Sequence, residues 1–268
     1  MGLVVQELEE KAAIGPRQIM LVGAHCRNVL HQALGFTELP GVTDTHDVDL
    51  GLVLSDWRAF ERVEGAFTAT GGNGIRYMIA GIPVDVMPFG EAVEDPRGVT
   101  RPRAVNGDLV VFGFDRVFEE SAEIMLVERG IRMRIATPVG YAILKLRAWT
   151  DRSSRGVWKD AKDMGVVLSW YAHSESVGDR VWDPDSELSD RYDGDPDLVS
   201  AHLLGQDMRS MLAEADADDL ASRFRASDIP RFVLEAGIDR LDEAGERGRR
   251  IVSALIAGLD AVKASDRS

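Results

Sequence analysis

The sequence is poor in cysteine and has no long apolar run. Cys26 is the single cysteine in 268 residues, so neither an intrachain disulfide nor a cysteine-based zinc site can form. No run reaches the roughly 18 apolar residues of a membrane-spanning helix. The N-terminus, MGLVVQELEEKAAIGPR, is acidic and lacks the basic-then-apolar order of a secretory signal. We therefore expect a cytoplasmic protein without a membrane partner.

Positive charge is also scarce. The chain has 31 Lys and Arg against 45 Asp and Glu, a formal net charge of −14. The deficit is uneven, since residues 95–162 hold 13 basic against 9 acidic side chains and residues 163–220 hold 3 against 15. One basic block suits a local phosphate or nucleic-acid contact. It argues against a broad nucleic-acid footprint, whose affinity grows with the number of phosphates neutralised.

The hydrophobic pattern divides the chain into two halves. It predicts an α+β fold: a mixed sheet with flanking helices over residues 1–136, then a helical domain over 137–268. The acidic stretch 174–197 is expected to be an exposed connector, with Trp182 and Tyr192 against the body. The expected strands are 18–22, 47–54, a hairpin over 74–90 that turns at Ala80-Gly81, 108–114 and a pair within 123–135. The expected helices are 24–34, 56–70 with Asp56 as N-cap, 138–150, 157–171, 198–214, 216–235 and 248–263.

Three aspartates stand in otherwise apolar strands. Asp47 and Asp49 alternate with Val48 and Leu50, so both point to one face, about 6–7 Å apart. Two uncompensated carboxylates at that spacing repel each other and are costly to bury. Either the face is open to water or a positive group lies between them. Asp85, in IPVDVMPFG, completes a cluster if its strand is a neighbour, and three carboxylates on a rigid sheet suit Mg²⁺.

A further pattern is a strand that ends at Gly23 and runs directly into a helix. Unpaired N–H groups and the positive end of the helix dipole suit a phosphate there. Any strand–helix turn can carry a glycine, so this pattern alone does not establish a phosphate site.

Taken together, these blocks resemble the nucleotidyltransferases of the polymerase-β superfamily. They are Gly23-Ala24 at the strand–helix turn, T-x-D-x-D from Thr45 to Asp49, and PVDVMPFG. In the second half, LKLRAWTDRSSRGVWKDAKDM (144–164) resembles the K…R…KDxxD segment of the AbiEii-like nucleotidyltransferases, bacterial toxin and abortive-infection enzymes. The resemblance covers roughly residues 18–172. The superfamily commonly has Gly-Ser or Gly-Gly where this chain has Gly23-Ala24, so a hydroxyl contact is lost and altered nucleotide affinity is expected.

The resemblance implies that the helical domain 137–268 completes the active site, and it implies a role for each matching residue. Asp47 and Asp49 would bind the metal ions, Mg²⁺ or Mn²⁺. Asp85 would be the third ligand and would deprotonate or position the acceptor hydroxyl. Lys145 and Lys159 would face the triphosphate, Lys145 as a catalytic residue. The other implied nucleotide-binding residues are Gly23, Ala24, Arg27, Thr45, Asp160 and Asp163, the last two orienting the basic helix or the nucleotide.

Each of these patterns also has an ordinary structural interpretation. Asp47 and Asp49 could begin a solvent-exposed strand. Lys145 could extend its ammonium group past apolar neighbours to the surface. Residues 159–163 could form a salt-bridged helix face.

The activity implied by the resemblance is Mg²⁺-dependent transfer of a nucleoside monophosphate from an NTP to an acceptor hydroxyl. The acceptor would be a tRNA end or a protein side chain, and a cognate antitoxin would be a further partner. The basic block favours RNA and the net charge opposes it, so the sequence does not choose. The alternative is a catalytically silent nucleotide-binding or regulatory module of a toxin–antitoxin or defence operon. Retention of three carboxylates with a basic helix argues against that alternative.

Overall fold

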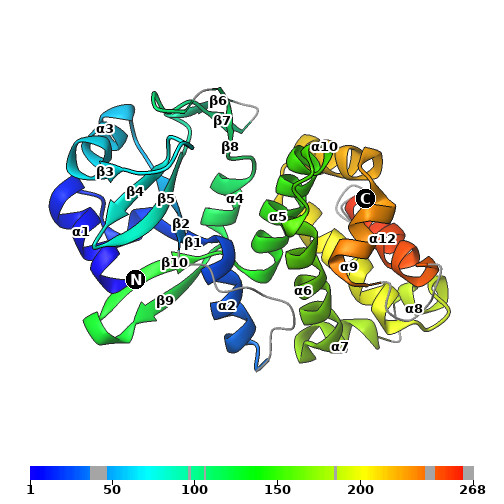
Figure 1. The fold of residues 1–268 in the computed structure, drawn as a ribbon. Helices are drawn as coiled ribbons and strands as arrows, with labels where there is room; N and C mark the ends of the chain where they lie inside the picture. Colours follow the sequence, from blue (N-terminus) through cyan, green and yellow to red (C-terminus); the bar gives the residue numbers. More distant parts are fainter. Residues whose placement is uncertain (37–46, 96–97, 106, 184–185, 239–244, 262–268) are drawn as a thin grey trace. The chain divides into compact units, whose positions relative to one another are not determined.

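The computed structural model describes residues 1–36, 47–95, 98–105, 107–183, 186–238 and 245–261. The chain forms two compact units, Met1–Thr137 and Pro138–Ser268, drawn from blue to green and from green to red in Figure 1. This division lies next to the expected boundary after residue 136. The fold is α+β, as predicted from the sequence pattern.

The first unit is built on a seven-stranded mixed sheet of order β3-β4-β5-β2-β1-β10-β9. In its centre, β2 runs parallel to β5 and antiparallel to β1, while β1 runs parallel to β10. A small second sheet has the order β6-β7-β8. The strands are β1 (Ile19–Val22), β2 (Val48–Val53), β3 (Thr68–Ala69), β4 (Arg76–Ile79), β5 (Ile82–Phe89), β6 (Glu94–Asp95), β7 (Val99–Thr100), β8 (Leu109–Val110), β9 (Ala122–Leu126) and β10 (Ile131–Ile135).

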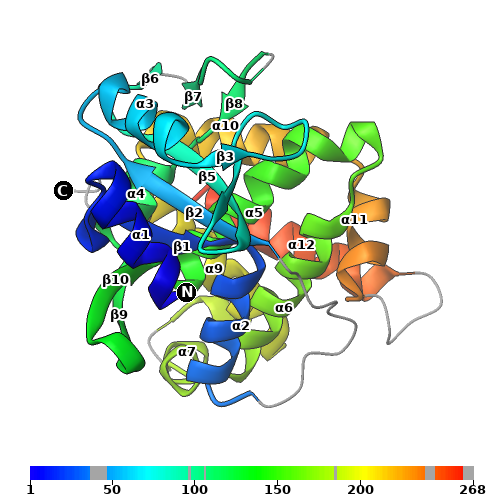
Figure 2. The same cartoon turned by 60° about the vertical axis from the view of Figure 1, so that its left-hand side comes forward.

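Helices flank this sheet, as Figures 1 and 2 show. They are α1 (Gly2–Ala12), α2 (Gly23–Ala33), α3 (Trp57–Ala66) and α4 (Phe114–Glu119). All four residues of β1 are buried, as expected for a strand in the middle of a sheet covered on both faces. The N-cap predicted at Asp56 is confirmed, since its carboxylate accepts the Ala59 N–H at 2.9 Å. The predicted hairpin is confirmed as β4 and β5, which turn at Ala80-Gly81.

The second unit is helical. Its core contains a cluster of aromatic rings. Phe232 meets Trp149 at 5.2 Å and Phe224 at 4.9 Å between ring centroids, both edge to face. The Trp149 indole donates to the Ser227 hydroxyl at 2.9 Å. The helices are α5 (Pro138–Arg152), α6 (Lys159–His173), α7 (Glu175–Val181), α8 (Leu188–Arg191), α9 (Pro196–Met211), α10 (Glu214–Ala226), α11 (Ile229–Ala236) and α12 (Glu246–Leu259).

Three local expectations were wrong. Only Leu109–Val110 of the expected strand 108–114 is a strand, because Phe114 begins helix α4. The acidic connector contains two helices, since Val177 and Val181 recur at helical spacing and are buried in α7. Trp182, expected against the body, is 65% exposed.

The expected single helix 216–235 is also wrong, because it is two helices. Asp228 caps the second one by accepting the Arg231 N–H at 3.0 Å, and Pro230 follows in its first turn. Across the described residues, no helix combines the length and the apolar character needed to cross a membrane.

Candidate functional site

The candidate site of the first unit begins with two aspartates on neighbouring parallel strands. Asp49 of β2 is paired in register with Asp85 of β5. Paired residues of adjacent strands share a face, so the two carboxylates leave the sheet on the same side. Asp47 lies two residues before Asp49, just ahead of β2. The strand order therefore gathers the three acids at one place on the sheet.

A positive group lies among these acids, and it is Arg76 of β4. Its guanidinium makes a two-nitrogen contact with Asp85, with Nε 2.7 Å from Oδ1 and Nη2 2.8 Å from Oδ2. The same Nη2 lies 2.6 Å from Asp47 Oδ2. One nitrogen thus bridges two carboxylates. This contact answers the question raised by the alternation of Asp47 and Asp49: the sheet supplies a cation of its own.

The surroundings hold Arg76 and Asp85 in this arrangement. The hydrogen bond to Asp85 is the main cause that raises the pKa of Arg76, with the charges of Asp85, Asp47 and Asp49 also favouring the protonated form against partial burial. Asn73 donates to Asp85 Oδ1 at 3.1 Å and accepts the Arg76 N–H at 3.1 Å. Asp85 is the most enclosed member of the Arg76–Asp47–Asp85 set, with its side chain 13% exposed against 33% for Asp47.

The donor set has the hard oxygen ligands that Mg²⁺ prefers, yet a guanidinium lies among them. Among the described residues, no three His, Cys, Asp or Glu side chains are placed to bind one metal. Arg76 takes the position between Asp47 and Asp85. A divalent cation would bind both of these carboxylates only if the guanidinium withdrew from them.

The strand–helix turn at Gly23 lies against the third acid. Val22 is paired with Asp49, and Gly23 follows with a φ of +67° at the first position of α2. A Cβ on Gly23 would overlap the carboxylate of Asp49. Glycine is therefore needed at position 23 for two reasons: the positive φ of the backbone and the close approach of Asp49. Ala24 follows half-buried in the first turn of α2.

The two remaining nucleotide-binding candidates of this unit are less informative. Arg27 is 7% exposed, and its guanidinium donates to Asn28 Oδ1 at 2.9 and 3.2 Å. It is thus engaged with its neighbour on α2. Thr45 lies outside the described residues.

In the second unit, Lys145 lies within an ion network. Its Nζ is 2.6 Å from Asp163 and 3.6 Å from Asp160. Asp160 is fully buried and also accepts a hydrogen bond from Arg152 at 2.9 Å. The side chain of Lys145 is 13% exposed, so the interpretation in which it reaches past apolar neighbours to the surface is wrong. Lys159 is exposed at the start of α6.

Arg76, Asn73 and Arg152 were missed by sequence reasoning, yet a signal for Arg76 is present. The two-residue turn at Ala80-Gly81 fixes the hairpin register, with Ile79 opposite Ile82 and Arg76 opposite Asp85. Counting back from the predicted turn would have placed a guanidinium beside the predicted carboxylate. No comparable count finds Arg152, which meets Asp160 across the bend between α5 and α6.

Comparisons with known proteins do not identify a family for this chain. No family model matches the chain, and no curated protein does. Among solved structures, the chain is similar to "Crystal structure of JHP933 from Helicobacter pylori", with 14% sequence identity over 96% of this chain and 88% of that one. The TM-score of 0.27 is too low to support an argument about fold or function.

Proposed function

We propose that the protein is a Mg²⁺-dependent nucleotidyltransferase of the AbiEii-like type, acting in bacterial toxin or phage-defence biology. It would move a nucleoside monophosphate from an NTP to the hydroxyl of a tRNA end or a protein side chain. The observation that carries the proposal is the pairing of Asp49 with Asp85 on adjacent parallel strands, with Asp47 joined to Asp85 through Arg76. Further support comes from the order and spacing of the sequence motifs that resemble those of the AbiEii-like nucleotidyltransferases.

Charge supports a divalent cation at this place. The set Arg76, Asp47 and Asp85 has a formal charge of −1, and Asp49 adds a further carboxylate beside it. A divalent cation would bring two positive charges where the guanidinium brings one. When bound, Mg²⁺ would polarise the α-phosphate and offset the charge on the departing pyrophosphate.

The chain's own groups would do the remaining work. Asp85, which contacts Arg76 and Asn73, is proposed to position the acceptor hydroxyl or to accept its proton. The N-terminus of α2 at Gly23 and Ala24 would contact a phosphate through backbone N–H groups. Lys145 and Lys159 are proposed to bind the triphosphate. Asp160 and Asp163 are proposed to fix Lys145, which they contact.

Arg76 also favours a second candidate, the catalytically silent nucleotide-binding or regulatory module. A guanidinium that stays on Asp47 and Asp85 would neutralise them without any metal. Such a protein would act through a partner, for example a cognate antitoxin.

A transfer assay separates the two candidates. The protein is incubated with Mg²⁺ and each α-³²P-labelled NTP, together with total tRNA or with a protein extract. Label that becomes covalently attached to one acceptor class, and that is lost in Asp85→Asn, supports the transferase. Since Asp85→Asn keeps the size of the side chain, circular dichroism checks that the fold survives. Absence of transfer to either class favours the silent module.

A further inference from the structure

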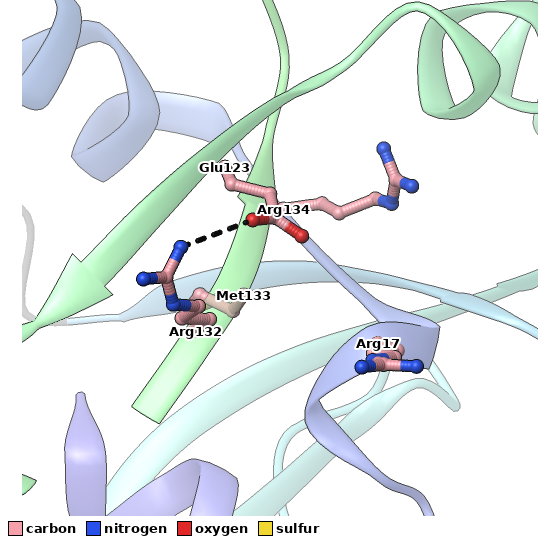
Figure 3. Close-up of a pocket in the computed structure, with 5 residues that line it drawn as sticks. All are labelled: Arg17, Glu123, Arg132, Met133 and Arg134. Carbon is pink, nitrogen blue, oxygen red and sulfur yellow. Dashed lines mark ion pairs between the residues drawn. The ribbon is translucent and has the colours of Figure 1, made fainter. Parts of the chain in front are cut away.

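A second feature of the first unit is a pocket of about 230 Å³ lined by Arg17, Glu123, Arg132, Met133 and Arg134 (Figure 3). Arg17 comes from the 3₁₀ turn Pro16–Gln18 ahead of β1, and the other four come from β9 and β10. The volume is several times the ~30 Å³ share of one water molecule. The pocket therefore has room for a small polyatomic anion.

The strands explain why the arginines line one hollow. Arg132 and Arg134 are two residues apart on β10, so both project from one face of the strand. Met133, which is also part of the lining, lies between them and is 1% exposed. Glu123 lies in register with Arg134 on β9.

The charges in this pocket are weakly compensated. The lining holds three arginines and one glutamate, a formal charge of +2. The dashed line of Figure 3 joins Arg132 to Glu123 at 3.6 Å, beyond hydrogen-bond distance, with both side chains more than half exposed. Within the described part of the chain, Arg17 has no hydrogen bond or ion pair.

Arg134 is fixed by neutral groups alone. Its Nη1 donates to the Ser121 hydroxyl at 3.1 Å, and its guanidinium lies over the Phe118 ring at 5.1 Å. Over the residues that the structure describes, no carboxylate forms an ion pair with it. These contacts orient the side chain while leaving its charge available to a ligand.

We propose that Arg17, Arg132 and Arg134 bind a dianionic phosphate group. Guanidinium groups match phosphate oxygens in geometry, and a pocket of formal charge +2 matches a dianionic phosphate better than a single carboxylate. The ligand is either free phosphate or the 5′-phosphate of an RNA strand. The site is distinct from the aspartates and does not depend on the nucleotidyltransferase proposal. It shares their face of the sheet, since Met20 is paired with Arg134 on one side and with Gly51, two residues from Asp49, on the other.

Binding experiments with matched RNAs test the site. A ten-nucleotide single-stranded RNA with a 5′-phosphate, the same RNA with a 5′-hydroxyl, and inorganic phosphate are titrated separately against the full chain. The test variant is Arg17→Gln/Arg132→Gln. The control Arg58→Gln/Arg103→Gln removes two exposed arginines of the same unit that do not line the pocket. Arg134→Lys keeps the positive charge but removes the planar guanidinium, whose paired N–H donors match phosphate oxygens.

We expect wild type and the control to bind a phosphate ligand and Arg17→Gln/Arg132→Gln to bind it at least about tenfold more weakly. Preference for the 5′-phosphorylated RNA over its 5′-hydroxyl twin identifies an RNA end as the ligand. Binding of inorganic phosphate without that preference identifies free phosphate. Equal binding by the test and control variants, or no phosphate-dependent binding by wild type, overturns the proposal.

Discussion

At the scale of single residues, the account depends on one guanidinium and the acids it contacts. Arg76 stabilises a cluster that would otherwise be costly, because adjacent carboxylates repel each other in a partly buried site. It also occupies the place between Asp47 and Asp85 where a cation would bind. The same side chain therefore stabilises the metal-free protein and would compete with the proposed metal ion.

Replacing Arg76 tests this competition. Without Mg²⁺, Arg76→Met should lower the free energy of unfolding by about 1 kcal/mol, since the pair with Asp47 and Asp85 is partly exposed. Added Mg²⁺ should raise the melting temperature of this variant more than that of wild type. Differential scanning fluorimetry over a Mg²⁺ series measures both. Arg101→Met, which also removes an arginine paired with two aspartates, is the control and should show no such gain. Equal responses of the two variants would contradict the account.

A second residue-scale effect concerns His202, which is buried and shares a 2.8 Å hydrogen bond with the Tyr192 hydroxyl. Burial lowers its pKa from 6.5 to about 4. The unfolded chain therefore takes up the proton first, and stability falls as the pH drops from 6.5 towards 4. At pH 4.5 this amounts to about 2 kcal/mol.

The variant His202→Gln lacks this titration. Urea unfolding of both proteins at pH 7 and pH 4.5 should show wild type losing about 2 kcal/mol more than the variant over that interval. Parallel losses in the two proteins would show that His202 does not titrate as its burial implies.

At the scale of elements, the strand–helix turn and the α5–α6 pair fix the candidate residues. Gly23 lets β1 pass into α2 while Asp49 lies against its backbone. In the second unit, Lys145 of α5 meets Asp160 and Asp163 of α6 in a largely buried network. Each arrangement makes a prediction that a matched control can isolate.

Gly23→Ala should cost more than its backbone strain alone. Gly35 has a similar positive φ but open space where a Cβ would stand, so Gly35→Ala measures the strain by itself, about 1 kcal/mol. Gly23→Ala should exceed this by at least about another 1 kcal/mol, because the new methyl group must displace Asp49. Chemical denaturation of both variants gives the difference. Equal losses would mean that Asp49 does not approach the turn as described.

Lys145→Met should destabilise the protein strongly. It leaves Asp160 and Asp163 without one of their cations in a buried setting, an effect of about 3 kcal/mol. The exposed Lys159 on the neighbouring helix is the control, and Lys159→Met should be within about 0.5 kcal/mol of wild type. Urea unfolding compares them. A mild effect at Lys145 would show that the network contributes little to stability.

At the scale of the whole molecule, the sequence predicted the mixed sheet and the helical second half because apolar periodicity is strong in both. The pattern placed Asp49 and Asp85 in strands. It could not show that these two strands are adjacent, because hydrophobic periodicity does not encode the order of strands in a sheet. The helices of the acidic segment were not predicted. In α7 only Val177 and Val181 mark the buried face, and the surrounding acidic residues indicated an exposed connector instead. The contact of Arg152 with Asp160 arises only from tertiary packing.

The central claim is that Asp47, Asp49 and Asp85 bind a nucleotide through a divalent cation. Isothermal titration calorimetry of ATP, GTP, CTP and UTP, with Mg²⁺ and with EDTA, tests it in wild type and in the isosteric variant Asp49→Asn. The account predicts that at least one NTP binds wild type in Mg²⁺ only, and binds the folded variant at least about tenfold more weakly. No NTP binding by wild type, or binding that neither EDTA nor Asp49→Asn weakens, would contradict it.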